Sequence, residues 1–174
     1  MRRALALLVF IALLLTGVLA IFNCGGGDTG TNPGTSGTEI GPEGGTVSDN
    51  GGASVYIPPD ALSVPATITV ETIFSDDDLP EEMDFYILDC SGGGVFGPHG
   101  LVFADSVTIT LPLDSLRTPG DTMALATWSE ADTAWDYTPF TAIVDPGGMS
   151  VSAKVTHFST FSVFPGTDPF DRVN

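Results

Sequence analysis

Residues 107–112 read Val-Thr-Ile-Thr-Leu-Pro, and this short stretch decides the fold. Its apolar residues alternate with threonines, so in an extended chain Val107, Ile109 and Leu111 all point to one face. The same period of two recurs in the segments 53–57, 67–71 and 151–155. Such alternation is typical of a half-buried strand, which has one face on a core and the other face in water.

Turn-forming residues separate the alternating segments. Proline or glycine stands between them at 58–59, 80, 98, 119–120 and 146–148. The 21 glycines and 13 prolines among 174 residues disfavour long helices, and no window sustains apolar residues at helical spacing. A length of 174 residues suits one ordinary domain. We therefore expect an all-β fold, an antiparallel two-sheet β-sandwich of about eight to ten strands.

The chain is strongly acidic. Its 22 Asp and Glu residues outnumber 5 Lys and Arg residues, which gives a formal net charge of −17. Two of the basic residues, Arg2 and Arg3, stand at the very start of the chain. A negative field of this size repels phosphates, so we expect no nucleic-acid partner and no adhesion to anionic lipid by charge.

The N-terminus has the layout of an export signal. Arg2 and Arg3 precede an apolar run over residues 4–22, which is interrupted only by Thr16 and Gly17. A positive start followed by an apolar run is typical of a secretory leader, which does not belong to the mature fold. We therefore expect residues 1–23 to be a signal peptide or a membrane anchor.

Cys24 stands just after the apolar run, one residue beyond its end, and precedes Gly-Gly-Gly-Asp. This layout resembles a bacterial lipoprotein signal, in which the cysteine receives the lipid, although Asn23 stands where a small residue is usual. Two alternatives stay open. Cleavage after Ala20 would release a periplasmic or secreted protein, whereas an uncleaved run is just long enough for a single membrane anchor. All three routes export residues 25–174. The lipid on Cys24 and the uncleaved anchor would each hold the chain at a cell membrane or outer membrane.

Composition divides the exported part into three segments. Residues 24–38 are rich in Gly and Thr and predict a flexible linker, residues 39–165 carry the strand pattern, and residues 166–174 predict a loose tail. The second cysteine, Cys90, is left alone if Cys24 carries a lipid, and the soluble route allows a Cys24–Cys90 disulfide. No Cys/His cluster suggests zinc, so we expect neither a metal nor another cofactor.

Several pieces of the sandwich segment together resemble one family. They are residues 40–47, 55–62, 66–70, 97–103, 107–112 and 155–163. In this order they resemble the ZU-five domain of ankyrins, netrin receptors and zonula occludens proteins, and similar domains on bacterial secreted proteins and lipoproteins. The resemblance covers residues 39–165 and implies a β-sandwich. It also implies an interaction module, since most members of this family are not enzymes that act on outside substrates.

The tripeptide His157-Phe158-Ser159 is the stretch with recognisable chemistry. In some relatives and look-alike folds a similar His-Phe-Ser or His-Leu-Thr sequence cuts its own chain. The hydroxyl of Ser159 would attack the carbonyl of Phe158, His157 would take the hydroxyl proton as general base, and water would hydrolyse the resulting ester. A strained turn and an oxyanion donor would be needed, and the sequence identifies no such donor. The structural alternative gives Phe158 to the core and leaves His157 and Ser159 to hold a turn.

Two other groups of residues could bind a ligand. Aromatic residues gather at Trp128, Trp135, Tyr137 and Phe140, which could form a platform for sugars but in a sandwich are more often core. The densest acidic run comprises Asp76, Asp77, Asp78, Glu81, Glu82 and Asp84. Because this run lacks the alternating Asp pattern of a calcium loop, we expect a solvated loop.

The remaining polar candidates have weaker support. His99 lies in a Gly-Pro-His-Gly sequence and is expected to be a turn residue. Ser63, Ser91 and Ser106 lack the Gly-x-Ser-x-Gly elbow of a hydrolase nucleophile.

The sequence therefore predicts a non-enzymatic interaction or structural module, tethered to the cell envelope through its N-terminus. Its expected partner is an envelope protein or polymer, and its oligomeric state stays open. The alternatives are a self-cleaving domain that cuts between Phe158 and Ser159, and a carbohydrate-binding module.

Overall fold

The alternating segments form strands in the computed structural model, which describes residues 37–74 and 91–164. These residues form ten strands and no helix, so the all-β prediction is confirmed and the described part contains no helix that could cross a membrane. The strands are β1 (Thr38–Ile40), β2 (Gly45–Ser48), β3 (Ser54–Ile57), β4 (Ala66–Ile73), β5 (Gly92–Gly97), β6 (Val102–Pro112), β7 (Thr122–Ser129), β8 (Ala134–Val144), β9 (Ser150–His157) and β10 (Thr160–Phe164).

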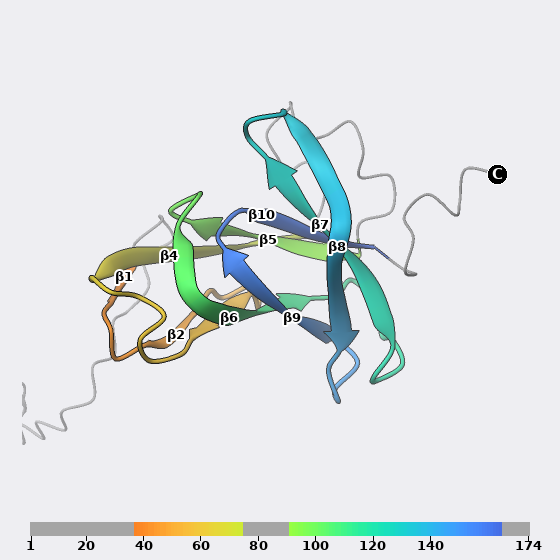
Figure 1. Ribbon diagram of the computed structural model, residues 1–174. Helices are drawn as coiled ribbons and strands as arrows, with labels where there is room; N and C mark the ends of the chain where they lie inside the picture. Colours follow the sequence, from red (N-terminus) through yellow and green to blue (C-terminus); the bar gives the residue numbers. More distant parts are fainter. Residues whose placement is uncertain (1–36, 75–90, 165–174) are drawn as a thin grey trace, which may run out of the picture. The chain divides into compact units, whose positions relative to one another are not determined.

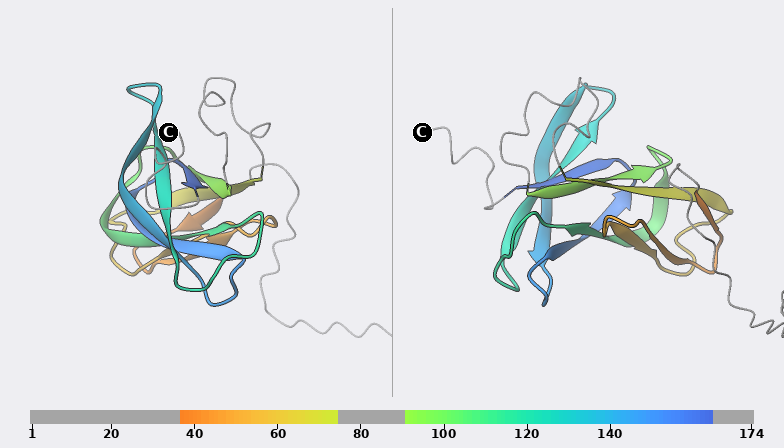
Figure 2. Two further views of the ribbon diagram at one scale, coloured as in Figure 1. Left: turned by 90° about the vertical axis from the view of Figure 1, so that its right-hand side faces the viewer. Right: turned by 180° about the vertical axis from the view of Figure 1, so that it is seen from behind.

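The strands pack as two layers. In Figures 1 and 2, β4, β5 and β10 lie in one layer and β9, β6, β3 and β2 lie in the other, with the β7–β8 hairpin at one end. Every strand pairs antiparallel with its neighbours, in the order β1-β4-β5-β10-β7-β8-β9-β6-β3-β2. The two layers of the sandwich are therefore parts of one continuous ladder. β8 joins them because it pairs with β7 along its length and with β9 through Ile143 and Val144.

The main core lies between the two layers. Val107, Ile109 and Leu111 of β6 are at most 1% exposed, whereas the threonines between them are half-buried. Phe158 and Phe161 are also fully buried in this core. The alternation in the sequence therefore predicted correctly which face of β6 is buried in the core and which is not.

A second apolar cluster packs on the other face of β7. It comprises Ile73, Ala124, Ala126, Trp128, Trp135 and Phe164, with Val95 packed against it. The neighbouring residues of β7, Met123 and Leu125, belong to the main core. Because β7 is buried on both faces, residues 123–126 are all apolar, and a period of two could not reveal this strand.

Strand β5 consists mostly of glycine, although glycine is unfavourable in strands. Gly92, Gly93 and Gly94 open this strand between β4 and β10. A Cβ on Gly93 would lie 2.7 Å from the carbonyl oxygen of Phe161, so a larger residue would push β10 away. The close approach of β10 is therefore the reason that this strand begins with glycines.

Candidate functional site

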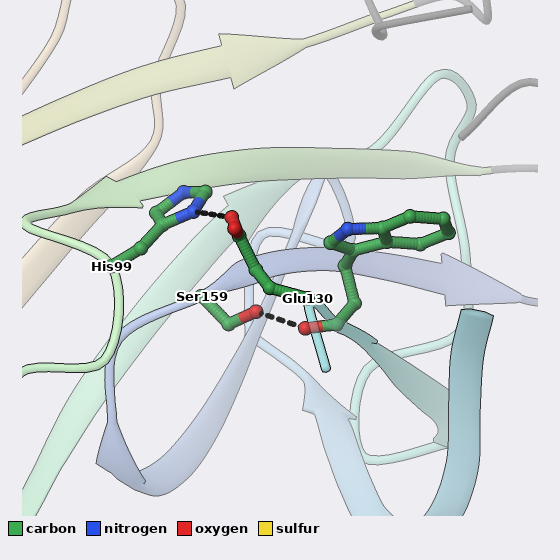
Figure 3. Close-up of polar contacts among 4 residues, drawn as sticks. His99, Glu130 and Ser159 are labelled. Carbon is green, nitrogen blue, oxygen red and sulfur yellow. Dashed lines mark hydrogen bonds and ion pairs between the residues drawn. The ribbon is translucent and has the colours of Figure 1, made fainter. Parts of the chain in front are cut away.

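Three connections of the sandwich contact one another. They are the β9–β10 link (158–159), the β5–β6 turn (98–101) and the β7–β8 turn (130–133). The Gly100 N–H donates to the Phe158 carbonyl at 3.0 Å, and the Phe158 N–H donates to the Leu101 carbonyl at 2.9 Å. Figure 3 shows two of the side-chain contacts made here, between His99 and Glu130 and between Ser159 and the Trp128 carbonyl. The fold thus brings several sequence candidates into one neighbourhood.

The His157-Phe158-Ser159 tripeptide crosses between the layers. β9 ends at His157 in the layer of β6, and β10 begins at Thr160 between β5 and β7. The Phe158 ring fixes this crossing, because it is 0% exposed and its centroid lies 4.7 Å from that of Phe103 and 5.7 Å from that of Phe96. A buried aromatic cluster of this kind holds the link rigidly in place.

The hydroxyl of Ser159 is directed at the backbone of β7. Ser159 is 5% exposed, and its Oγ donates a hydrogen bond of 2.7 Å to the Trp128 carbonyl. A serine hydroxyl carries one proton. While that proton is shared with Trp128, it is not shared with the imidazole of His157. In this arrangement the buried Ser159 hydrogen bond connects the β9–β10 link to β7.

The Phe158 carbonyl already has a hydrogen-bond donor. The Gly100 N–H, 3.0 Å away, points at the oxygen that would carry the negative charge if Ser159 attacked this carbonyl. Sequence reasoning found no such donor. Gly100 is far from the tripeptide in sequence, and no local pattern predicts which turn the β-sheet register brings beside it.

His157 is the last residue of β9 and pairs in register with Val102 of β6. Its side chain is half-buried, with the ring centroid 6.3 Å from that of Phe161. In the described residues the non-glycine residues with positive φ are Asp60 and Thr133, so the turn that follows His157 stores no strain of this kind. The strained turn expected for self-cleavage therefore lacks this support.

His99 makes an unexpected contact for a turn residue. Its Nδ1 lies 2.7 Å from Oε1 of Glu130, which links the β5–β6 turn to the β7–β8 turn. The two side chains are 32% and 66% exposed, so the pair is largely solvated. A solvated contact of this kind contributes less than about 1 kcal/mol to stability, so its main effect is to set the two turns beside each other.

The two tryptophans do not form an exposed platform. Trp128 and Trp135 are each 6% exposed and pack edge to face, with ring centroids 5.6 Å apart. They belong to the second apolar cluster, in agreement with the core role that the sequence favoured. The side chains of Tyr137 and Phe140 lie outside the described residues.

The other sequence candidates lie apart from this neighbourhood or outside the described residues. Ser91 is buried and its Oγ accepts a hydrogen bond of 3.0 Å from Arg117, while Ser63 is exposed before β4 and Ser106 lies in β6. Within the described ranges no three His, Cys, Asp or Glu side chains are placed to hold a metal ion. Outside the described residues lie the leader, Cys24, Cys90, the acidic run of residues 76–84 and the tail.

Comparison with known proteins adds no family assignment. No family model matches the sequence, and no curated protein matches it. The ZU-five resemblance therefore stays a prediction that is consistent with the all-β fold.

Proposed function

We propose that the chain is a non-catalytic interaction or structural module with a ZU-five-like sandwich, held at the cell envelope through its N-terminus. One observation carries this proposal, namely the 2.7 Å hydrogen bond from the buried Ser159 hydroxyl to the Trp128 carbonyl. It gives a structural role to the serine of the one tripeptide that suggested chemistry. The leader, the Gly/Thr-rich linker and the net charge of −17 suit a soluble domain presented on a tether.

The mass of the purified full chain tests this proposal. We expect the wild type and the Ser159→Ala variant to remain whole under denaturing conditions, and to differ only by the lost oxygen atom. A wild type that divides into fragments ending at Phe158 and beginning at Ser159, beside an intact Ser159→Ala chain, would overturn the non-catalytic role.

Self-cleavage is the second candidate, and the Gly100 N–H favours it. In this reaction Oγ of Ser159 forms a bond to the Phe158 carbonyl carbon, and the hydroxyl proton goes to His157. The C–N bond then breaks, the Ser159 nitrogen takes up that proton, and water hydrolyses the ester. The Gly100 N–H would hold the oxyanion. The reaction requires Ser159 to leave Trp128, and the mass measurement above detects its products.

The tether has its own test. Metabolic labelling with a palmitate analogue should label the wild type and the Cys90→Ala variant but not the Cys24→Ala variant. Cys90→Ala is the matched control because it also removes one thiol. Labelling of all three proteins, or of none, would contradict a lipid on Cys24.

A further inference from the structure

The outer face of β2, β3, β6 and β9 carries an array of hydroxyl groups and one aromatic ring. Two rows of paired residues cross these four strands, and we call them together the hydroxyl face. The rows are Thr46–Tyr56–Thr108–Lys154 and Ser48–Ser54–Thr110–Ser152. With strands about 4.8 Å apart, each row is roughly 14 Å long, which suits a short stretch of an extended polymer.

Tyr56 is the prominent side chain of this face. It is 50% exposed, whereas its neighbours in β3, Val55 and Ile57, are fully buried. Thr46 and Thr108 flank it on the adjacent strands. The side chains of these three residues make no hydrogen bond to any other residue that the structure describes, so ring and hydroxyls are free to meet a ligand.

Two hydroxyl groups of the second row are hydrogen-bonded within the protein. The Ser152 hydroxyl donates to Asp145 at 2.9 Å, and the hydroxyls of Thr110 and Ser152 lie 3.3 Å apart. Since the proton of Ser152 goes to Asp145, Thr110 donates to Ser152. These bonds hold that end of the face in a fixed arrangement.

The charge of the hydroxyl face differs from that of the chain. None of its eight residues is acidic and one, Lys154, is basic, although the chain as a whole carries −17. The surrounding negative charge repels anionic polymers. A second copy of the chain would be repelled in the same way, and a single exposed tyrosine gives little of the apolar area that protein interfaces need.

We propose that the hydroxyl face binds a neutral polysaccharide, with one sugar ring stacked on Tyr56 and the sugar hydroxyls bonded to Thr46 and Thr108. An aromatic ring supplies the apolar contact and flanking hydroxyls both donate and accept, which is the chemistry that a pyranose ring offers in return. This inference rests on the proposed interaction role and names its ligand. The carbohydrate site that it proposes contains the exposed Tyr56 and not the buried tryptophans.

Affinity electrophoresis of the detergent-solubilised full chain tests the proposal. Hydroxyethyl cellulose in a native gel is the neutral probe, and alginate is the anionic one. We expect hydroxyethyl cellulose to slow the wild type and alginate to leave it unchanged. Tyr56→Ala should weaken the retardation about two- to tenfold, while Tyr56→Phe should keep most of it because the ring remains.

Phe74→Ala is the matched control, because Phe74 is an aromatic residue 57% exposed beyond the end of β4. We expect this variant to be retarded like the wild type, and thermal melting will show whether each variant is folded. Equal retardation of folded Tyr56→Ala and wild type, no retardation of the wild type, or equal retardation by alginate would each overturn the proposal. So would a wild-type dimer in sedimentation that Tyr56→Ala converts to a monomer.

Failure here can be told apart from failure of the non-catalytic role. A cleaved wild type in the mass measurement overturns that role and leaves the retardation result standing. An intact chain that no neutral polysaccharide slows overturns only the ligand assignment.

Discussion

Ser159 shows how one side chain can carry a structural role inside a tripeptide that suggests chemistry. Its hydroxyl is buried and bonded to the Trp128 carbonyl, and the Phe158 carbonyl beside it is bonded to the Gly100 N–H. Both bonds join segments that are distant in sequence. The residue types of the tripeptide were visible in the sequence, but its partners were not, because strand register decides which backbone groups face it.

At this scale we predict the cost of removing the hydroxyl. Ser159→Ala leaves the Trp128 carbonyl without that donor, so the free energy of unfolding should fall by about 1–3 kcal/mol. Urea denaturation measures this change. Ser129→Ala is the control, because the Ser129 hydroxyl bonds Asp132 at an exposed turn, and its loss should cost about 0.5 kcal/mol or less. Equal stability of Ser159→Ala and the wild type would mean that Phe158 packing alone holds the link.

The strands differ in how well their sequence patterns predict them. The alternation in β6 and β9 predicted one face in the core and one in water, and the burial of Val107 and Val155 confirms it. β7 is buried on both faces and β5 is made largely of glycine, so neither shows a period of two. The continuity of the two layers through β8 depends on long-range pairing, which no local pattern contains.

Asp49 connects elements of the two layers and provides the prediction at this scale. Its carboxylate accepts hydrogen bonds from Gly51, Gly52 and Ala53 in the β2–β3 turn, and from both the N–H and the hydroxyl of Thr72 in β4. Hydrogen bonds to a charged group are worth about 1.5–3 kcal/mol each and are not additive. Asp49→Ala should therefore lower the unfolding free energy by at least about 2 kcal/mol in urea denaturation.

Glu71→Ala is the control for this change, because Glu71 is an exposed carboxylate one residue before Thr72. We expect it to change the unfolding free energy by about 0.5 kcal/mol or less. If the two variants lose equal stability, the five bonds of Asp49 do not hold the turn against β4.

At the scale of the whole chain, charge is the dominant feature. A formal net charge of −17 places many like charges on one chain, and self-repulsion of this kind opposes the compact state. Among the described residues, the ion pair between Arg117 and Asp114 is partly exposed and offsets little of it. Screening by salt should therefore stabilise the fold.

We expect the melting temperature at pH 7 to rise by roughly 2–6 °C when NaCl increases from about 0.01 M to about 0.15 M, because the Debye length falls from about 30 Å to about 8 Å. Thermal unfolding followed by circular dichroism measures the shift. The control is the same titration near pH 4.1, the isoelectric point of the sequence, where the net charge vanishes and salt should have little effect. A melting temperature that falls with salt at pH 7 would show that attractive ion pairs outweigh the repulsion.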